Sequence, residues 1–165
     1  MVEANVRAEA LVALGKALKQ ESDGKAMRRD LIRELKKPLA PAVAEIKAGL
    51  MSISSGGLPA DGQPMRRTVA RRIATQVKLS GRLAGVRVRA RKTPELRGFA
   101  NAAKRLNSPK GFRHQVFGSN RWVVQFGRPN YFDDPLTERR AEFRQGVLDT
   151  MQATAQRIAD NSTRG

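Results

Sequence analysis

An apolar stripe of helical spacing constrains the fold more than any other feature of this sequence. Between Lys25 and Ser52, apolar residues return every three or four positions, as on one face of an α-helix. Pro38 and Pro41 interrupt the pattern, since each removes a backbone donor and clashes with the preceding turn, but the stripe keeps its phase. One long, kinked helix is therefore predicted. Its buried positions are predicted to be Met27, Leu31, Leu35, Leu39, Val43, Ile46 and Leu50.

Amphipathic helices are also predicted at both ends of the chain. Apolar residues recur at helical spacing over residues 3–20, before the polar cluster ESDG. Near the other end, Asp134 precedes Pro135, which combines an N-cap carboxylate with a proline at the first helical position. A C-terminal helix is therefore predicted over residues 133–160, with a frayed tail over residues 161–165. Its buried positions are predicted to be Leu136, Phe143, Val147, Met151, Ala155 and Ile158.

The apolar period changes from helical to alternating in the middle of the chain. In VRVRARK, the apolar residues 86, 88 and 90 alternate with arginines, which indicates a strand with one apolar and one cationic face. Gly81 and Gly85 predict a turn and a bulge before it, so the preceding TQVKLS is predicted to pair with it. A second strand is predicted at RWVVQF (121–126), and short helical segments are predicted at MRRTVARRIATQ and at residues 99–106.

Together these elements predict an α+β fold. A small antiparallel sheet is expected to pack against the long kinked N-terminal helix and the C-terminal amphipathic helix. The chain has 165 residues, the size of one ordinary domain, and contains no internal repeat and no long linker. We therefore predict a single domain over residues 1–165. Its parts are predicted to be a helical N-terminal part (1–52), a loop (53–64), a basic β-rich part (65–132) and the C-terminal helix (133–160).

The composition excludes several kinds of chemistry. The chain has no cysteine and a single histidine, His114, so it can form no disulfide, no thiolate metal site and no site with several histidines. As a general base, His114 would need an orienting acid, yet no acid lies between Glu95 and Asp133. Adjacent carboxylates at Asp133 and Asp134 are better explained as a helix cap than as a metal pair. We expect no enzyme activity, no catalytic residue, no metal and no cofactor.

Targeting and membrane signals are missing from the pattern of apolar residues. No run approaches the ~18 apolar residues of a membrane span, and the N-terminal segment lacks the continuous apolar region of a secretory signal. We therefore expect a soluble protein that is not exported and has no membrane partner.

Positive charge is concentrated in the middle of the sequence. The chain carries a net charge of +17, and between Gly62 and Phe132 there are 17 lysines and arginines against one acid, Glu95. Such a region is typical of contact with phosphate or with an acidic protein. In the predicted strand, alternate arginines stand about 7 Å apart on one face, a row suited to either partner, and the alternative is a strand face that is merely solvated. The patch expected to face another subunit or DNA consists of Arg66, Arg67, Arg71, Arg72, Arg87, Arg89 and Arg91.

All eight aromatic residues lie between Phe99 and Phe143. Because aromatic side chains contribute much of the area in most cores, this half of the chain is predicted to supply the anchor of the core. The alternative is a platform on which nucleic-acid bases stack beside a basic groove. The alternation around Val123 and Val124 favours the first interpretation, a strand that buries its rings.

The order of these segments resembles the neck or tail-component family of long-tailed bacteriophages, which is common in phages of actinobacteria. In that family a phrase like R-H-P-V-F-G precedes a W-V-x-Q strand, a P-G-W/Y-F turn and a final helix. Gln115 stands where the family usually has proline, and Asn130 where it usually has glycine; asparagine tolerates positive φ better than most residues. The resemblance is carried by Arg113, His114, Val116, Phe117, Gly118, Trp122, Val123, Gln125, Pro129 and Phe132.

The resemblance implies a structural virion protein at the head–tail interface. The chain would form one ring of the connector between the portal complex and the tail, a homo-oligomer of roughly six or twelve copies. Its partners would be neighbouring connector and tail proteins, with non-specific contact to DNA in the channel. RHQVFGSNRWVVQ would then be a closing turn and strand of the core, with Trp122 and Phe117 pinning it to the last helix and His114 fixed by a hydrogen bond.

A second function class fits the same charge distribution. The basic middle could bind nucleic acid phosphates, as in a ribosomal or nucleoid-like protein. Against this stand the two balanced helical ends, which look like packing elements, and the lack of a recognisable nucleic-acid motif. Both hypotheses therefore stay open at the level of the sequence.

Overall fold

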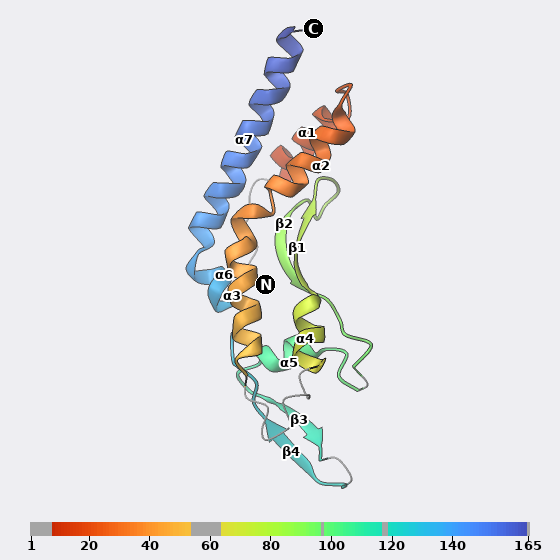
Figure 1. Ribbon diagram of the computed structural model, residues 1–165, viewed down its shortest axis with the longest axis vertical. Helices are drawn as coiled ribbons and strands as arrows, with labels where there is room; N and C mark the ends of the chain where they lie inside the picture. Colours follow the sequence, from red (N-terminus) through yellow and green to blue (C-terminus); the bar gives the residue numbers. More distant parts are fainter. Residues whose placement is uncertain (1–7, 54–63, 97, 117–118, 165) are drawn as a thin grey trace. The chain divides into compact units, whose positions relative to one another are not determined.

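The computed structural model describes residues 8–53, 64–96, 98–116 and 119–164 (Figure 1). It contains helices and two small antiparallel two-stranded sheets, which confirms the predicted α+β class. The chain folds as two compact units, each assembled from separated segments, so their boundaries differ from those of the four predicted parts. The first unit comprises Met1–Pro41, Thr75–Val88 and Thr137–Gly165, and the second comprises Ala42–Ala74 and Arg89–Leu136.

The kinked N-terminal helix is confirmed, as α2 (Gly24–Glu34), the 3-10 turn η1 (Lys37–Leu39) and α3 (Ala40–Met51). The kink lies at Pro38, where the chain changes to a 3-10 turn. Most of the predicted stripe is buried, but Ala42 is fully buried where Val43 was expected. Val43 is half-buried, and Ile46 and Leu50 are buried as predicted, so the difference is confined to the first turn of α3.

Helices α1 (Ala8–Ala17), α2 and α7 (Arg140–Arg164) form most of the first unit. Along α7 the chain contacts α1, α2 and η1, and the close approach to η1 depends on Gly146. A Cβ atom there would lie 2.9 Å from the Pro38 ring, closer than real Cβ contacts come. The core of this unit includes Leu11, Leu14, Leu18, Leu31, Leu35, Leu39, Phe143, Val147 and Met151.

The C-terminal helix differs from its prediction in three ways. Asp134 lies inside the first turn of α6 (Asp134–Glu138) and is not the cap of one continuous helix, because the chain turns at Asn130 and α7 starts only at Arg140. Ala155 is exposed, and Thr154 is buried instead. Its hydroxyl donates to the carbonyl oxygen of residue 150 at 3.0 Å, which satisfies the polar group inside the helix. Finally, residues 161–164 are helical, so the predicted frayed tail was wrong there.

The hairpin predicted around VRVRARK is confirmed. Strands β1 (Ile73–Lys78) and β2 (Gly85–Ala90) pair, and helix α4 (Pro64–Arg71) precedes them. Val86 and Val88 are 4% and 7% exposed, so the alternation of the sequence is the alternation of buried and outward side chains. Gly81 adopts φ +78° in the connection, which explains why a residue without a side chain stands there.

The second unit contains most of α3, α4, helix α5 (Ala102–Asn107) and a second hairpin. Strand β3 (Phe112–Gln115) pairs antiparallel with β4 (Trp122–Gln125). The second predicted strand is therefore correct, whereas the stretch assigned to a closing turn is itself a strand. Gly111, with φ +66°, begins the hairpin; a Cβ atom there would lie 2.6 Å from the carbonyl oxygen of Gln125.

Candidate assembly surface of the second unit

Arg66 belongs to the fold and not to a free cationic patch. Its Nη1 donates to the carbonyl oxygens of Met51, at 3.0 Å, and Ile53. Met51 is the last residue of α3 and Ile53 lies two residues beyond it, where carbonyls lack partners within the helix. A guanidinium is well placed there, since it supplies both donors and a charge that favours the negative helix end.

Two further arginines of the predicted patch also have partners inside the chain. The Nε and Nη2 atoms of Arg72 donate to one carboxylate oxygen of Glu95, at 3.0 and 2.9 Å. The pKa of Glu95 lies below its ordinary value, first because its own backbone amide donates to the carboxylate and also because of Arg72. Arg87 is half-buried and donates to the side-chain oxygen of Gln76 on the paired strand, at 3.1 Å.

The four remaining arginines are exposed: Arg67, Arg71, Arg89 and Arg91. Within the described part of the chain their side chains make no hydrogen bond or ion pair. Arg67 and Arg71 lie one helical turn apart on α4, and the backbone amide of Arg91 donates to the carbonyl oxygen of Arg72 at 3.0 Å. The second unit as a whole has 15 lysines and arginines against five acids in its sequence. These four guanidiniums are the part of the predicted patch that can meet a partner.

Large apolar side chains are exposed along one face of the β3–β4 hairpin. Alternate residues share a face of a strand, and Trp122 and Val124 are 56% and 54% exposed. The alternation continues to Phe126, one residue beyond β4, which is 59% exposed and lies beside Gly111. Arg113 pairs directly with Val124, so it shares this side, and its guanidinium lies 6.0 Å from the Trp122 ring centre. We call Arg113, Trp122, Val124 and Phe126 the hairpin face.

The opposite side of the hairpin packs on its own unit. The rings of Phe99 and Phe112 are 5.0 Å apart, and His114 follows at 6.0 Å from Phe112. The guanidinium of Arg105 lies over the Phe99 ring, 5.0 Å from its centre. The predicted hydrogen bond of His114 is local, between Nδ1 and the carbonyl oxygen of Gln115 at 3.1 Å.

The prediction that Trp122 closes the core was therefore wrong. Burial was assigned to the strand because it is rich in apolar residues, but Phe99 covers only the side that carries Phe112 and His114. The other motif residues vary in exposure. Arg113, Gln125 and Pro129 are exposed, His114 and Phe132 are half-buried, and Phe117 and Gly118 lie outside the described residues.

Tyr131, and not Trp122, is the buried aromatic among the described residues of this unit. It is 3% exposed, and its hydroxyl donates to the carbonyl oxygen of Ala103 at 3.3 Å. Burial, and to a smaller extent the charge of Asp133, raise the pKa of this tyrosine, so its hydroxyl remains a donor. The neighbouring Asn130 has φ +58°, a conformation that asparagine tolerates better than most residues.

Asn107 fixes the same turn, although no sequence motif marks it. Its side-chain oxygen accepts from the amide of Phe132 at 2.9 Å, and its side-chain nitrogen donates to Asp133 at 2.6 Å. The amide of Asn130 donates to its backbone carbonyl at 3.0 Å. An asparagine at a helix end beside a turn is a weak sequence signal, because only the fold brings the two segments together.

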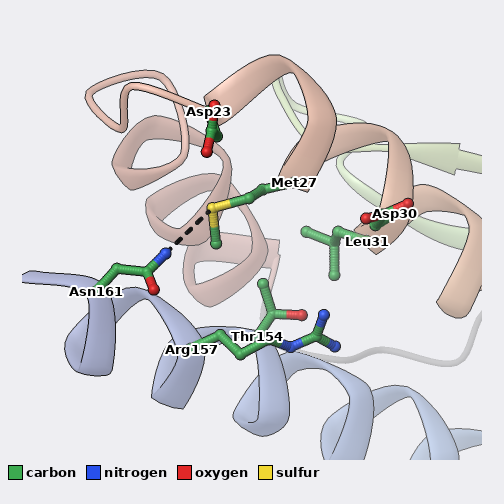
Figure 2. A pocket seen from close by; sticks show the side chains of 7 residues that line it. All are labelled: Asp23, Met27, Asp30, Leu31, Thr154, Arg157 and Asn161. Carbon is green, nitrogen blue, oxygen red and sulfur yellow. Dashed lines mark hydrogen bonds between the residues drawn. The ribbon is translucent and has the colours of Figure 1, made fainter.

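The first unit contains a small pocket of about 160 Å³ between α2 and α7. Figure 2 shows Asn161 directed toward Met27, with its side-chain nitrogen 3.9 Å from the sulfur. None of the pocket residues belongs to the predicted sites. The pocket is lined by Asp23, Met27, Asp30, Leu31, Thr154, Arg157 and Asn161.

No protein-family model, curated protein or solved structure matches this chain. Among the residues that the structure describes, no three histidine or acidic side chains come together in a group that could hold a metal ion. In the same residues, no helix is both long enough and apolar enough to cross a membrane.

Proposed function

We propose that this chain is a structural virion protein of a tailed phage, a ring component of the head–tail connector that joins the capsid portal complex to the tail. The observation that most supports this is the position of the residues that carry the resemblance to the phage family. Several of them, of which Trp122 is the largest, lie on the β3–β4 hairpin and expose their side chains to solvent. Contiguous exposed apolar surface marks protein–protein contact sites. A subunit that functions only inside an assembly has a reason to present such a surface.

The free arginines fit the same proposal. Arg67, Arg71, Arg89 and Arg91 would face either acidic groups on a neighbouring subunit or DNA in the channel. Three of the seven predicted patch arginines donate inside the chain, and one of them, Arg72, is also paired with an acid, so fewer guanidiniums are free to bind phosphates. A moderate patch suits a channel, because a protein that binds many phosphates holds DNA tightly and would hinder its passage.

Native mass and particle composition test this function. The nuclease-treated protein should form a closed ring at moderate salt, measured by native mass spectrometry and electron microscopy. Quantitative mass spectrometry of purified virions should find the chain at the copy number of that ring. Virions that lack the chain would contradict the proposal, whatever the oligomeric state of the isolated protein.

Nucleic-acid binding is the second candidate, and the four free arginines are the observation that favours it. The test is the salt dependence of duplex DNA binding, because removing one phosphate-binding side chain should flatten the slope by about one unit. Replacing Arg89 with Glu should weaken such binding, whereas Arg66→Gln should act through stability, since Arg66 is bound to the end of α3. Tight DNA binding near physiological salt by a monomer would favour this candidate over the connector.

A further inference from the structure

The hairpin face combines apolar anchors with cations and has no acid of its own. Trp122, Val124 and Phe126 are each more than half exposed, and the guanidinium of Arg113 covers part of the indole. From residue 110 to residue 128 the sequence has four lysines and arginines and no acid. Aromatic residues and arginine are the residues enriched at the energetic centres of protein interfaces.

The spacing of the rings argues against nucleic acid as the occupant of this face. Trp122 and Phe126 are four residues apart on an extended chain, which places their rings roughly 13 Å apart. Stacked bases repeat at about 3.4 Å along a strand, so neighbouring bases could not use both rings as one platform. Between them stands Val124, which offers an aliphatic contact and no ring.

Charge argues against a second copy of the chain. Each copy carries a net charge of +17, so another copy would bring positive charge to a face that is already cationic. On the C-terminal helices, the exposed acids Glu138 and Glu142 are interspersed with arginines. The nearest acid to the hairpin in the preceding sequence, Glu95, is already paired with Arg72.

We propose that the hairpin face docks a different protein, whose contact surface is apolar at the centre and rich in carboxylates at the rim. Trp122 and Phe126 would insert as anchors on either side of Val124, and Arg113 would pair with a carboxylate of the partner. The chemistry of the partner follows from this face alone. Its place as an adjacent ring of the connector rests on the proposed function.

A photo-crosslinking probe at Phe126 tests this proposal in the cells that naturally produce the chain. The full-length protein carries p-benzoylphenylalanine at position 126 or, as a second probe, at 124. One control places the probe at Gln125, which is exposed on the opposite side of the same strand. The other uses Leu83, an exposed apolar residue of the β1–β2 connection. Mass spectrometry of the products identifies the captured peptide.

The expected result is capture of one other protein from positions 126 and 124, through a peptide with Asp or Glu beside the captured residue. Neither control position should give this product. A second substitution, Arg113→Glu, should lower its yield by about tenfold, because it brings a like charge against the rim. Capture of the chain's own copies, capture of nucleic acid alone, equal yields at all positions, or no product from positions 126 and 124 would each overturn the proposal.

The outcome is separable from that of the proposed function. Virions that contain the chain, together with self-capture at position 126, would leave the connector role standing and refute the docking surface. Conversely, absence from virions, together with capture of an acidic protein, would support the docking surface and refute the connector role.

Discussion

Both hairpins of this chain consist of two paired strands, but the apolar residues of one are buried and those of the other are exposed. In β1–β2, Val86 and Val88 are almost fully buried while the alternating arginines point outward. In β3–β4, Trp122, Val124 and Phe126 are each more than half exposed. The first hairpin is closed by the chain's own ion pair, since Arg72 precedes β1 and Glu95 follows β2. Within the described residues Arg113 of the second hairpin forms no ion pair, and under our proposal a partner supplies the acid.

The largest expected effect is a difference in the free energy of unfolding between two variants, each of which places an aspartate at a valine of one hairpin. Val86→Asp should lower the free energy of unfolding by about 3–5 kcal/mol, because it buries a charge without a partner. Val124→Asp should change it by no more than about 0.5 kcal/mol, because position 124 is exposed. Urea denaturation followed by circular dichroism measures both. Similar reductions for the two variants would contradict the assignment of a buried and an exposed hairpin.

A smaller effect is expected at the glycine that starts the second hairpin. Gly111→Ala should cost about 1–3 kcal/mol, because its φ is +66° and the new Cβ would lie 2.6 Å from the Gln125 carbonyl oxygen. Gly98→Ala is the matched control, with φ +71° and no atom within 4 Å of the added carbon. The difference between the two shifts in melting temperature, each measured against the parent chain, gives the cost of the close contact between the new Cβ and the opposite strand. Equal shifts would mean that backbone strain alone explains both.

Trp122→Ala should have a smaller effect still on stability. The side chain is 56% exposed and its clearest specific contact is Arg113, so the loss should be about 0.5–1 kcal/mol. A buried aromatic would behave differently: Phe143→Ala, at 3% exposure, should cost about 3–5 kcal/mol. Thermal melting of the two variants compares them directly. If removing Trp122 destabilised the chain as much as removing Phe143, the hairpin face would be part of a core.

The sequence predicted well wherever one local rule decided the structure. Alternation at Val86 and Val88 gave a buried strand face because only one of its two faces is apolar. The phase of the long stripe predicted a kinked helix, since Pro38 lies in the 3-10 turn and Pro41 in the first turn of α3, where a proline is tolerated. Gly81 marked the turn of the first hairpin, because glycine adopts its positive φ without strain.

Prediction failed where the local sequence was equally compatible with two structures. Both faces of the β3–β4 hairpin carry apolar residues, so periodicity could not say which one the unit covers. The contact between Phe99 and Phe112 decides it, and these residues are separated by a helix and a turn. The same limit applies to the arginines. Arg66 and Arg67 are neighbours in sequence, yet only the fold places the end of α3 against one of them.

The smallest expected effect concerns the ion pair that closes the first hairpin. Glu95 has a folded pKa below its ordinary value of 4.5, so folding favours the ionised carboxylate. Its stabilising contribution is therefore fully present above that ordinary value and is lost as pH falls through the lower, folded pKa. Glu95→Gln should reduce stability at neutral pH and flatten its decline toward acid, measured as melting temperature against pH.

The two causes of the lowered pKa can be separated with a partner variant. In Arg72→Met the ion pair is gone, but the backbone amide of Glu95, the larger cause, still donates to the carboxylate. The acid-side slope should therefore fall only part of the way toward that of Glu95→Gln. A slope unchanged from the parent chain would mean that Arg72 does not close the hairpin through charge. The contrast with β3–β4, where the acid must come from outside, would then lose its electrostatic basis.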